Sequence, residues 1–391
     1  MDGLTQKVDA QFDDLVDLRR DLHRHPERSS AETRTTKVLL EATTALGLEQ
    51  LPCPTETGAL LRLEGGRPGR TVLIRADIDA LPITEYEGES FRSIHEGVMH
   101  ACGHDGHAAA LVGVAGALAA HAEALPGTYL VCFQPAEEGL HGAAAMVGGG
   151  LLEALGVDAV IGCHLASPAP VGIVGYKAGL SWAEANQFTI TLSGLGGHGA
   201  MAPTDGNVIL ALANVVQRLA GVAEGLSYEG VGCSCSAGQV HAGTAANVIP
   251  DRAQLHGTLR TFDAASTREA LNRLEQLCAE VAAEGGVVAT VEFGGRTPAV
   301  ENDPLVTEIA AACAREVVGE PGVLELPPVT TSDDMSEFLA RVPGAYLLVG
   351  AGKADGSSGM HHHPGFSIDE AAIAVAAKVL ASTAVALATP R

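Results

Sequence analysis

The sequence is poor in aromatic residues, which make up 4% of its 391 residues, and it has few positive charges. Lys and Arg together number 24 against 47 Asp and Glu, which gives a formal net charge of −23. A surface of this sign repels phosphate backbones and anionic lipids. We therefore expect no nucleic acid and no membrane surface among the partners of this protein.

Long hydrophobic runs are also lacking. The most apolar stretch extends from Ala108 to Ala120 and is followed by His121 and Glu123, whereas a helix needs roughly 20 apolar residues to cross a bilayer. The first residues carry acids and lack the basic start and apolar core of a signal peptide. We expect a cytoplasmic protein without a transmembrane segment.

Cysteine pairs of the C-x-x-C type are missing as well, and the eight cysteines are scattered along the chain. This spacing gives little support to a disulfide framework. Histidine, by contrast, is abundant: 15 histidines stand beside one Trp and five Tyr. Because imidazole is the commonest neutral metal ligand and acid-base group, the places where histidines cluster are the first functional clue.

The first half of the chain alternates between short apolar runs and helical patterns. The runs at 72–74, 129–133 and 157–161 are typical of buried, largely parallel strands, and Ala-rich segments between them are typical of helices. We expect an α/β fold whose mixed, largely parallel sheet is covered by helices. Ligand-type side chains follow the three runs, at the edge where sites form in such sheets: Asp77, Asp79, Glu137, Glu138 and His164.

The pattern changes between residues 183 and 294, where alternating segments and two amphipathic helices follow one another in the order β-α-β-β-α-β. This order is that of the ferredoxin-like unit, with an antiparallel sheet that is open on one face. After Pro298 the α/β pattern resumes. We therefore expect two domains, a discontinuous one formed by 1–182 with 295–391 and an inserted one at 183–294.

Residues 99–107 contain three histidines, one cysteine and one aspartate immediately before a helix. The thiolate of Cys102 and the imidazole of His104 can both face a metal ion of borderline softness. The alternative is a polar loop in which Asp105 caps the helix.

Glu137 and Glu138 are adjacent carboxylates on a turn. Such a pair can divide its work, one side chain binding metal while the other takes a proton from the attacking water. Two solvated acids at a helix start are the alternative. His164 could likewise be a core residue without a ligand role. The histidines at 361–363 could belong to an exposed loop.

A rival chemistry uses Cys102 as a nucleophile with a nearby histidine as its base. That reading leaves Glu137, Glu138, His164 and the 361–363 cluster without a role. A two-metal site accounts for all of them and is the hypothesis that we favour.

In the inserted segment, His198 lies in a glycine-rich turn that could be a simple hairpin connection. Asn247 and Arg260 offer an amide and a guanidinium group on adjoining elements. Arginine is the natural bidentate partner of a carboxylate, although it could equally pair with a surface acid. In so acidic a protein, an anionic substrate needs such a local clamp.

Taken together, these motifs resemble the M20 family of metallopeptidases and amidohydrolases, in the branch that contains N-acyl-amino-acid amidohydrolases, hippurate hydrolases and auxin-conjugate hydrolases. The resemblance implies a two-metal catalytic domain with an inserted lid or dimerisation domain. It spans nearly the whole chain and rests on these segments: 22–27, 75–82, 99–107, 133–139, 196–200, 244–250 and 257–263.

The resemblance also implies roles for single residues. Glu137 becomes the general base, and Asp79 orients a ligand. His198 stabilises the developing oxyanion and in some members comes from a partner subunit, while Asn247 and Arg260 reach the substrate. The implied metal ligands are Cys102, His104, Glu138, His164 and His362.

Three places depart from the usual family pattern. Three histidines stand in a row at 361–363, so His362 is chosen by its spacing to Pro364 and Phe366, and His361 and His363 remain open. The residues at 165–168 replace the aromatic residue and proline that usually follow the ligand histidine. The segment 332–338 also differs, so details of the substrate pocket are open.

We expect hydrolysis of the amide bond of N-acyl amino acids, with two divalent ions that could be Zn, Mn, Co or Ni. A dipeptidase or carboxypeptidase with the same site is one alternative, and a non-catalytic metal-binding protein is another. A homodimer through the lid domain is also expected, because an edge strand of an antiparallel sheet can pair with a second copy.

Overall fold

The computed structural model describes residues 2–139, 141–201 and 205–390. The chain forms two compact units. Unit 1 consists of residues 1–179, 301–326 and 334–391, and unit 2 consists of residues 180–300 and 327–333. The strands β7 (Gly179–Trp182) and β16 (Val300–Asn302) lie where the chain passes between the units. The domain boundaries expected from the sequence, 183 and 294, stay a prediction.

Unit 1 is built on an eight-stranded sheet with the order β1-β2-β4-β3-β5-β18-β6-β17. In the centre of the sheet, β3 runs parallel to β4 and to β5, and β5 runs parallel to β18. Antiparallel pairs join β1 to β2, β2 to β4 and β6 to β18. The strands span Glu49–Leu51 (β1), Ala59–Glu64 (β2), Arg67–Asp77 (β3), Pro126–Gln134 (β4), Ala159–Pro170 (β5), Val174–Tyr176 (β6), Val323–Glu325 (β17) and Gly344–Gly352 (β18).

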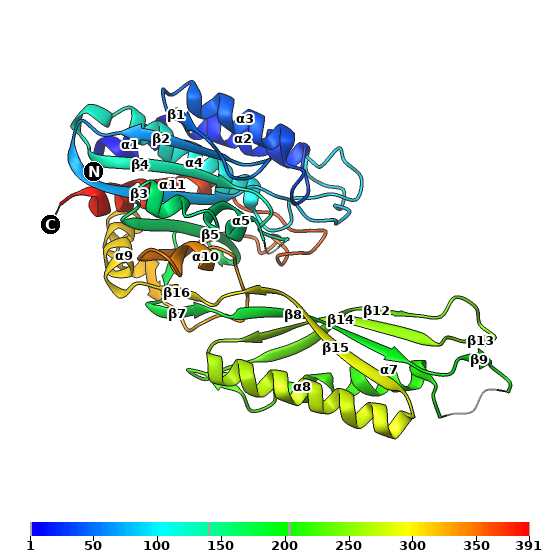
Figure 1. Ribbon diagram of the computed structural model, residues 1–391. Coiled ribbons are helices and arrows are strands. Elements are labelled where there is room, and N and C mark those ends of the chain that lie inside the picture. The colour runs from blue at the N-terminus through cyan, green and yellow to red at the C-terminus, as the bar shows by residue number, and fades with distance from the viewer. Residues whose placement is uncertain (1, 140, 202–204, 391) are drawn as a thin grey trace. The chain divides into compact units, whose positions relative to one another are not determined.

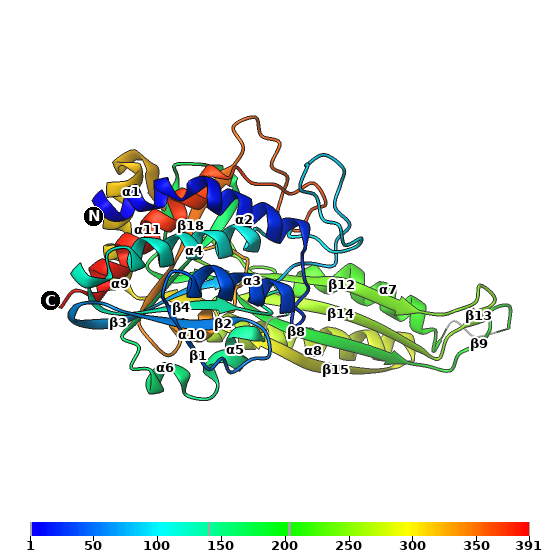
Figure 2. The ribbon, with the colours of Figure 1, turned by 90° about the horizontal axis from the view of Figure 1, so that it is seen from above.

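Helices cover both faces of this sheet (Figure 2). Helices α4 and α11 pack together against β3, β4 and β5, while α5 and α10 contact each other and the strands β4 and β18. The helices span Asp2–Ala10 (α1), Phe12–Arg24 (α2), Thr33–Thr44 (α3), His104–Ala119 (α4), Gly142–Val147 (α5), Leu151–Ala154 (α6), Pro304–Val318 (α9), Ser336–Leu339 (α10) and Ala371–Ala388 (α11). The expected α/β fold with a largely parallel, helix-covered sheet is confirmed.

Unit 2 has the expected ferredoxin-like order (Figure 1). Its four-stranded antiparallel sheet has the order β12-β14-β8-β15, and helices α7 and α8 pack on it. Its main elements span Glu184–Ser193 (β8), Val208–Arg218 (α7), Ser234–Ala242 (β12), Arg252–Thr261 (β14), Ala264–Gly285 (α8) and Val288–Thr297 (β15). Short paired strands complete it: Gly197–His198 (β9), Ser227–Tyr228 (β10), Val231–Gly232 (β11) and Val248–Ile249 (β13).

Each unit has its own hydrophobic core. Helix α11 is the one helix among the described residues that is long and apolar enough to cross a membrane, and 67% of its apolar window is buried within the protein. Because α11 packs against α4, α9 and the central strands, its apolar composition is that of a core helix.

Candidate metal centre

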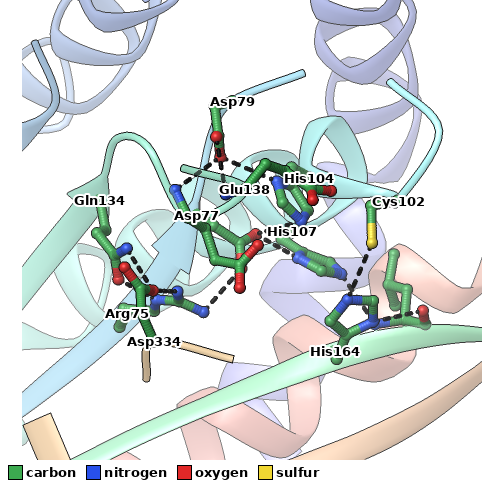
Figure 3. Close-up of polar contacts among 12 residues, drawn as sticks. Arg75, Asp77, Asp79, Cys102, His104, His107, Gln134, Glu138, His164 and Asp334 are labelled. Carbon is green, nitrogen blue, oxygen red and sulfur yellow. Dashed lines mark hydrogen bonds and ion pairs between the residues drawn. The ribbon is translucent and has the colours of Figure 1, made fainter. Parts of the chain in front are cut away.

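The candidate site lies at the carboxyl ends of the central strands of unit 1 (Figure 3). β3 ends at Asp77 and β4 ends at Gln134, so Asp79 and the turn with Glu137 and Glu138 follow directly. His164, which we expected just beyond a strand, instead lies inside β5, because that strand continues to Pro170. Within the sheet β5 lies between β3 and β18, and His164 is in register with Leu348 of β18.

Cys102 is the centre of the ligand groups. Its Sγ lies 3.4 Å from His164 Nε2 and 3.7 Å from His361 Nδ1. Two sets of ligand atoms lie within 4.8 Å of one another, one from Cys102, His104 and Glu138 and the other from Cys102, His164 and His361. Both sets contain the thiol of Cys102.

The ring hydrogen bonds of His104 and His164 leave one nitrogen of each for a metal. His104 Nδ1 donates to Asp79 Oδ1 at 3.2 Å, and His164 Nδ1 donates to Leu165 O at 2.8 Å. In the neutral form of both rings these contacts place the proton on Nδ1 and leave the lone pair on Nε2. His104 Nε2 is buried and makes no hydrogen bond among the described residues, so this nitrogen fits the role of a metal ligand.

His107, which the sequence motif also contains, uses both of its nitrogens. Its Nδ1 donates to Asp77 Oδ1 at 2.5 Å, and its Nε2 accepts from the backbone N–H of Leu165 at 2.9 Å. No lone pair is left for a metal, although Asp77, His104 and His107 are close together. Through these two hydrogen bonds His107 links the end of β3 to β5.

A buried polar network behind the site was not found from the sequence. The Arg75 guanidinium donates to Asp77 at 2.7 Å, to Asp334 at 2.9 Å and to Gln134 at 2.7 Å. Asp334 also accepts from the backbone N–H of Ala143 at 2.9 Å. Arg75 and Gln134 stand at the strand ends and within the segments 75–82 and 133–139, and these are the sequence signals that could have found them.

Asp105 does not cap α4, the alternative that the sequence left open. The N-cap is Gly103, whose φ of 96° lets the chain turn from Cys102 into the helix. The buried Asp105 carboxylate instead pairs with Arg19 Nε at 2.7 Å and His23 Nδ1 at 2.8 Å. It anchors the start of α4 to α2.

The three consecutive histidines face different ways. His361 accepts the backbone N–H of Ser167 at its Nε2 at 3.2 Å. His362 has a left-handed φ of 61°, and its Nε2 lies 3.2 Å from Glu138 Oε1. His363 packs edge-on against Tyr86 with ring centroids 5.7 Å apart. His361 and His362 therefore reach the ligand groups, and His363 faces Tyr86.

Charges at the site favour a cation. Although burial opposes it, Asp77 and Asp79 raise the pKa of His104 well above its ordinary value, so the pocket attracts positive charge. Burial and neighbouring histidines lower the pKa of His164 well below its ordinary value, which keeps this ring neutral and able to donate a lone pair. Burial and then Glu138 raise the pKa of the Cys102 thiol above its ordinary value.

Unit 2 holds the other three predicted residues. The exposed His198 on β9 pairs with β13, and the neighbouring Gly199 N–H donates to the backbone oxygen of Asn247 at 2.9 Å. Arg260 lies at the other end of the sheet, where it donates to Ser332 Oγ at 2.8 Å. Unit 2 thus brings His198 and Asn247 together and holds Arg260 apart from them.

Residues 73–386 match the profile of peptidase family M20/M25/M40. N-acetyl-L-cysteine deacetylase of Bacillus subtilis is 33% identical over 370 residues, covering 95% of this chain and 87% of that protein. Thermostable carboxypeptidase 2 of Saccharolobus solfataricus is 32% identical and covers 95% of this chain and 94% of its own.

Solved structures resemble the whole chain. The Bacillus subtilis YXEP protein, described as a dinuclear metal binding peptidase from the M20 family, superposes with a TM-score of 0.78 at 32% identity. The match covers 97% of this chain and 99% of that one.

Proposed function

The chain belongs to peptidase family M20/M25/M40 and is a metal-dependent hydrolase, and we propose that it cleaves the amide bond of N-acyl amino acids. The observation that carries the proposal is the pair of carboxylates on one turn. Glu138 stands in a ligand group with Cys102 and His104, while the adjacent Glu137 is buried beside it. The deacetylase activity of the Bacillus subtilis relative supports an N-acyl substrate.

The residues at the site fit two divalent ions. Cys102, His104 and Glu138 would hold one ion, and Cys102, His164 and His362 would hold the other. Sulfur, nitrogen and carboxylate donors together suit Zn, Mn, Co or Ni. When bound, the ions would act as Lewis acids that polarise the substrate carbonyl and acidify the attacking water.

His362 fits the second group better than His361 because of the protons on the rings. His361 Nε2 accepts a backbone N–H, so its proton sits on Nδ1, the atom that faces Cys102. A protonated nitrogen cannot bind a metal. The His362 ring has no such backbone donor among the described residues and approaches Glu138.

Glu137 acts as the general base. It takes a proton from the water as the oxygen bonds to the carbonyl carbon, and it returns that proton to the amine nitrogen as the C–N bond breaks. His198 donates to the oxyanion that develops on the carbonyl. Removing one donor of this kind costs about 3 to 4 kcal/mol in other hydrolases.

Arg260 and Asn247 bind the substrate carboxylate. The guanidinium of Arg260 is oriented by Ser332 and by the backbone oxygen of Thr330. Charge-assisted hydrogen bonds from arginine to a carboxylate are strong, and in a protein with a net charge of −23 they offset the general repulsion of an anionic substrate.

The proposal also includes a partner chain and a cellular location. We propose a homodimer through unit 2, because β12 is an edge strand whose residues 236–242 are exposed. We also propose a cytoplasmic location, which the eight free cysteines support, since a reducing compartment keeps thiols unpaired.

A carboxypeptidase or dipeptidase activity is the second candidate. The 32% identity to a thermostable carboxypeptidase is nearly equal to the identity to the deacetylase. The same donors and the same base would cleave a peptide bond, so only the groups around the acyl side of the substrate separate the two activities.

The test is release of free amino acid from a panel of N-acetyl amino acids, N-benzoyl amino acids and dipeptides. Protein loaded with Mn or Zn should cleave the N-acyl compounds, and a chelated sample should not. Glu137→Gln should lose turnover by a factor of roughly 10² to 10⁴ while it keeps its metal. Cleavage of dipeptides alone would select the second candidate, and an active, metal-loaded Glu137→Gln variant would refute the base assignment.

A further inference from the structure

The turn that carries Glu137 and Glu138 begins with a strained residue. Ala136 has a φ of 54°, in the left-handed region that is unfavourable for a residue with a Cβ. The turn is also tight, because a Cβ at Gly142 would collide with the backbone oxygen of Pro135. Such a conformation persists only if surrounding groups hold it.

Two buried carboxylates hold three consecutive backbone amides of this turn. The N–H of Ala136 donates to Glu32 Oε1 at 2.8 Å. The N–H groups of Glu137 and Glu138 donate to the two oxygens of Asp79 at 3.1 and 3.0 Å. Asp79 was expected from the sequence, whereas Glu32 was not.

Glu32 is fully buried and is held by hydrogen bonds alone. Besides the Ala136 N–H, it accepts from the Ser30 N–H at 3.0 Å and from Thr57 Oγ1 at 2.7 Å. No ion pair to Glu32 occurs among the described residues, and burial raises the pKa of its carboxyl group. Burying a carboxylate without a neighbouring cation lowers the stability of a fold. The charge of Glu32 therefore contributes little to the stability of this protein.

The segment from Ser29 to Glu32 also contacts residues next to the turn. Ser29 Oγ donates to Asp79 Oδ2 at 2.6 Å, and Ser30 Oγ lies 3.2 Å from His141 Nε2. The segment precedes α3 and is about a hundred residues away in the chain, so these contacts join the N-terminal region to β4.

We propose that Glu32 is a positioning residue that fixes the left-handed turn at Ala136 and thereby aims the carboxylates of Glu137 and Glu138. This proposal rests on the function proposed above, in which those two carboxylates act as base and ligand. Glu32 touches neither substrate nor metal, and it acts through one hydrogen bond acceptor, Oε1.

Hydrogen exchange of the metal-free protein tests this placement without any activity. In Glu32→Ala the amides of Ala136 to Glu138 should exchange about fivefold faster or more, because a net hydrogen bond of about 1 kcal/mol is lost. Glu32→Asp shortens the side chain by one methylene, which moves the carboxylate away from the Ala136 N–H, and it should speed exchange in the same way. This variant replaces Glu32→Ala in the experiment if the Ala variant does not fold.

Glu32→Gln is the rescue variant. Its amide oxygen can accept from both the Ser30 and the Ala136 N–H, and its NH₂ group can donate to Thr57 Oγ1, so exchange should stay within about threefold of the parent protein. Glu27→Ala is the matched control. The Glu27 carboxylate also holds two backbone amides, those of Arg34 and Thr35, but it has no contact with the turn.

Kinetics with an N-acyl substrate give the second readout. Glu32→Ala and Glu32→Asp should lower kcat by about tenfold or more with little change in KM, and Glu32→Gln should restore most of kcat, while Glu27→Ala should not lower it. Unchanged exchange at 136–138 in the Ala and Asp variants would overturn the proposal, as would an equal loss of kcat in Glu32→Gln. If the parent protein cleaves no N-acyl amino acid, the function proposed above fails, and hydrogen exchange alone still decides whether Glu32 holds the turn.

Discussion

The histidines of unit 1 differ in which ring nitrogen takes part in a hydrogen bond. This difference decides which rings keep a lone pair that can bind an ion. His104 and His164 donate from Nδ1 to an acceptor, which leaves Nε2 as a ligand. His107 and His361 each accept a backbone N–H at Nε2, which places their proton on Nδ1. Residue type alone does not separate the two classes.

We therefore predict different metal contents for two neighbouring variants. His362→Ala should lose one of two bound ions, because it removes a donor from the second ligand group. His361→Ala should keep both ions, because the His361 lone pair is already used by Ser167. Elemental analysis after gel filtration measures the stoichiometry.

His363→Ala is the control, since its ring faces Tyr86. Loss of an ion in His361→Ala together with full occupancy in His362→Ala would reverse the assignment.

The sequence predicted ligands in two short motifs, Cys102 and His104 before a helix and Glu138 after a strand, and the structure brings the ligand atoms of these three residues within 4.8 Å of one another. It did not reveal Glu32, because the acceptor and the Ala136 N–H are brought together only by the fold. The choice among the histidines at 361–363 depends on local backbone angles such as the left-handed φ of His362, and residue pattern does not specify these.

At the scale of elements, three long helices begin with a side chain that accepts backbone N–H groups. These caps are Asn207 for α7, Asp263 for α8 and Asp303 for α9. Asp263 Oδ1 accepts from Ala265 and Ser266 at 2.9 Å each. Because α8 covers the sheet of unit 2, its cap contributes to the stability of that unit.

We predict that Asp263→Ala lowers the free energy of unfolding of unit 2 by about 1 kcal/mol, within a range of about 0.5 to 2 kcal/mol. Hydrogen bonds from Ser266 lower the pKa of Asp263 below its ordinary value. A lowered pKa means that the stabilisation is present at neutral pH and is lost as the pH falls through the folded pKa, below about pH 4. Urea unfolding at pH 7 and at pH 3.5 measures the difference.

Asp251→Ala is the comparison variant, because the Asp251 side chain is exposed and makes no hydrogen bond among the described residues. An equal loss of stability in both variants, or a difference that grows on acidification, would argue against the cap.

Elements with strong periodicity were predicted best. The alternating segments and two amphipathic helices expected between residues 183 and 294 appear in the expected order as β8, α7, β12, β14, α8 and β15. The short strands β1, β6 and β17 were not predicted, because three residues hold no periodicity and their pairing partners come from distant segments.

At the scale of the whole molecule, the length of one strand limits what a single copy can do. Arg252 and Arg260 stand near the two ends of β14, eight residues apart, which is about 26 Å at 3.3 Å per residue. His198 and Asn247 lie beyond the Arg252 end. One copy can therefore present either Arg260 or the His198–Asn247 pair to a small substrate, but not both.

If all three residues act on one substrate, two copies must supply them, and inactive variants should complement each other. Glu137→Gln and His198→Ala are each expected to be nearly inactive alone. Mixed dimers would contain one intact site, so equal mixing should restore about one quarter of the parent activity after subunit exchange.

Activity assays with differently tagged chains measure this recovery and the exchange together. Mixed dimers that form without any recovery of activity would show that His198 serves its own chain, and a monomeric, active protein would exclude the shared site.

The position of β18 in the sheet has a consequence for biosynthesis. This strand, residues 344–352, lies between β5 and β6, and the histidines at 361–363 follow it. Unit 2 is formed mainly by residues 180–300, so on the ribosome it can fold while the central sheet of unit 1 still lacks a strand. The candidate ligand residues of unit 1 can therefore come together only after β18 and the histidines at 361–363 have been synthesised, later than unit 2 can fold.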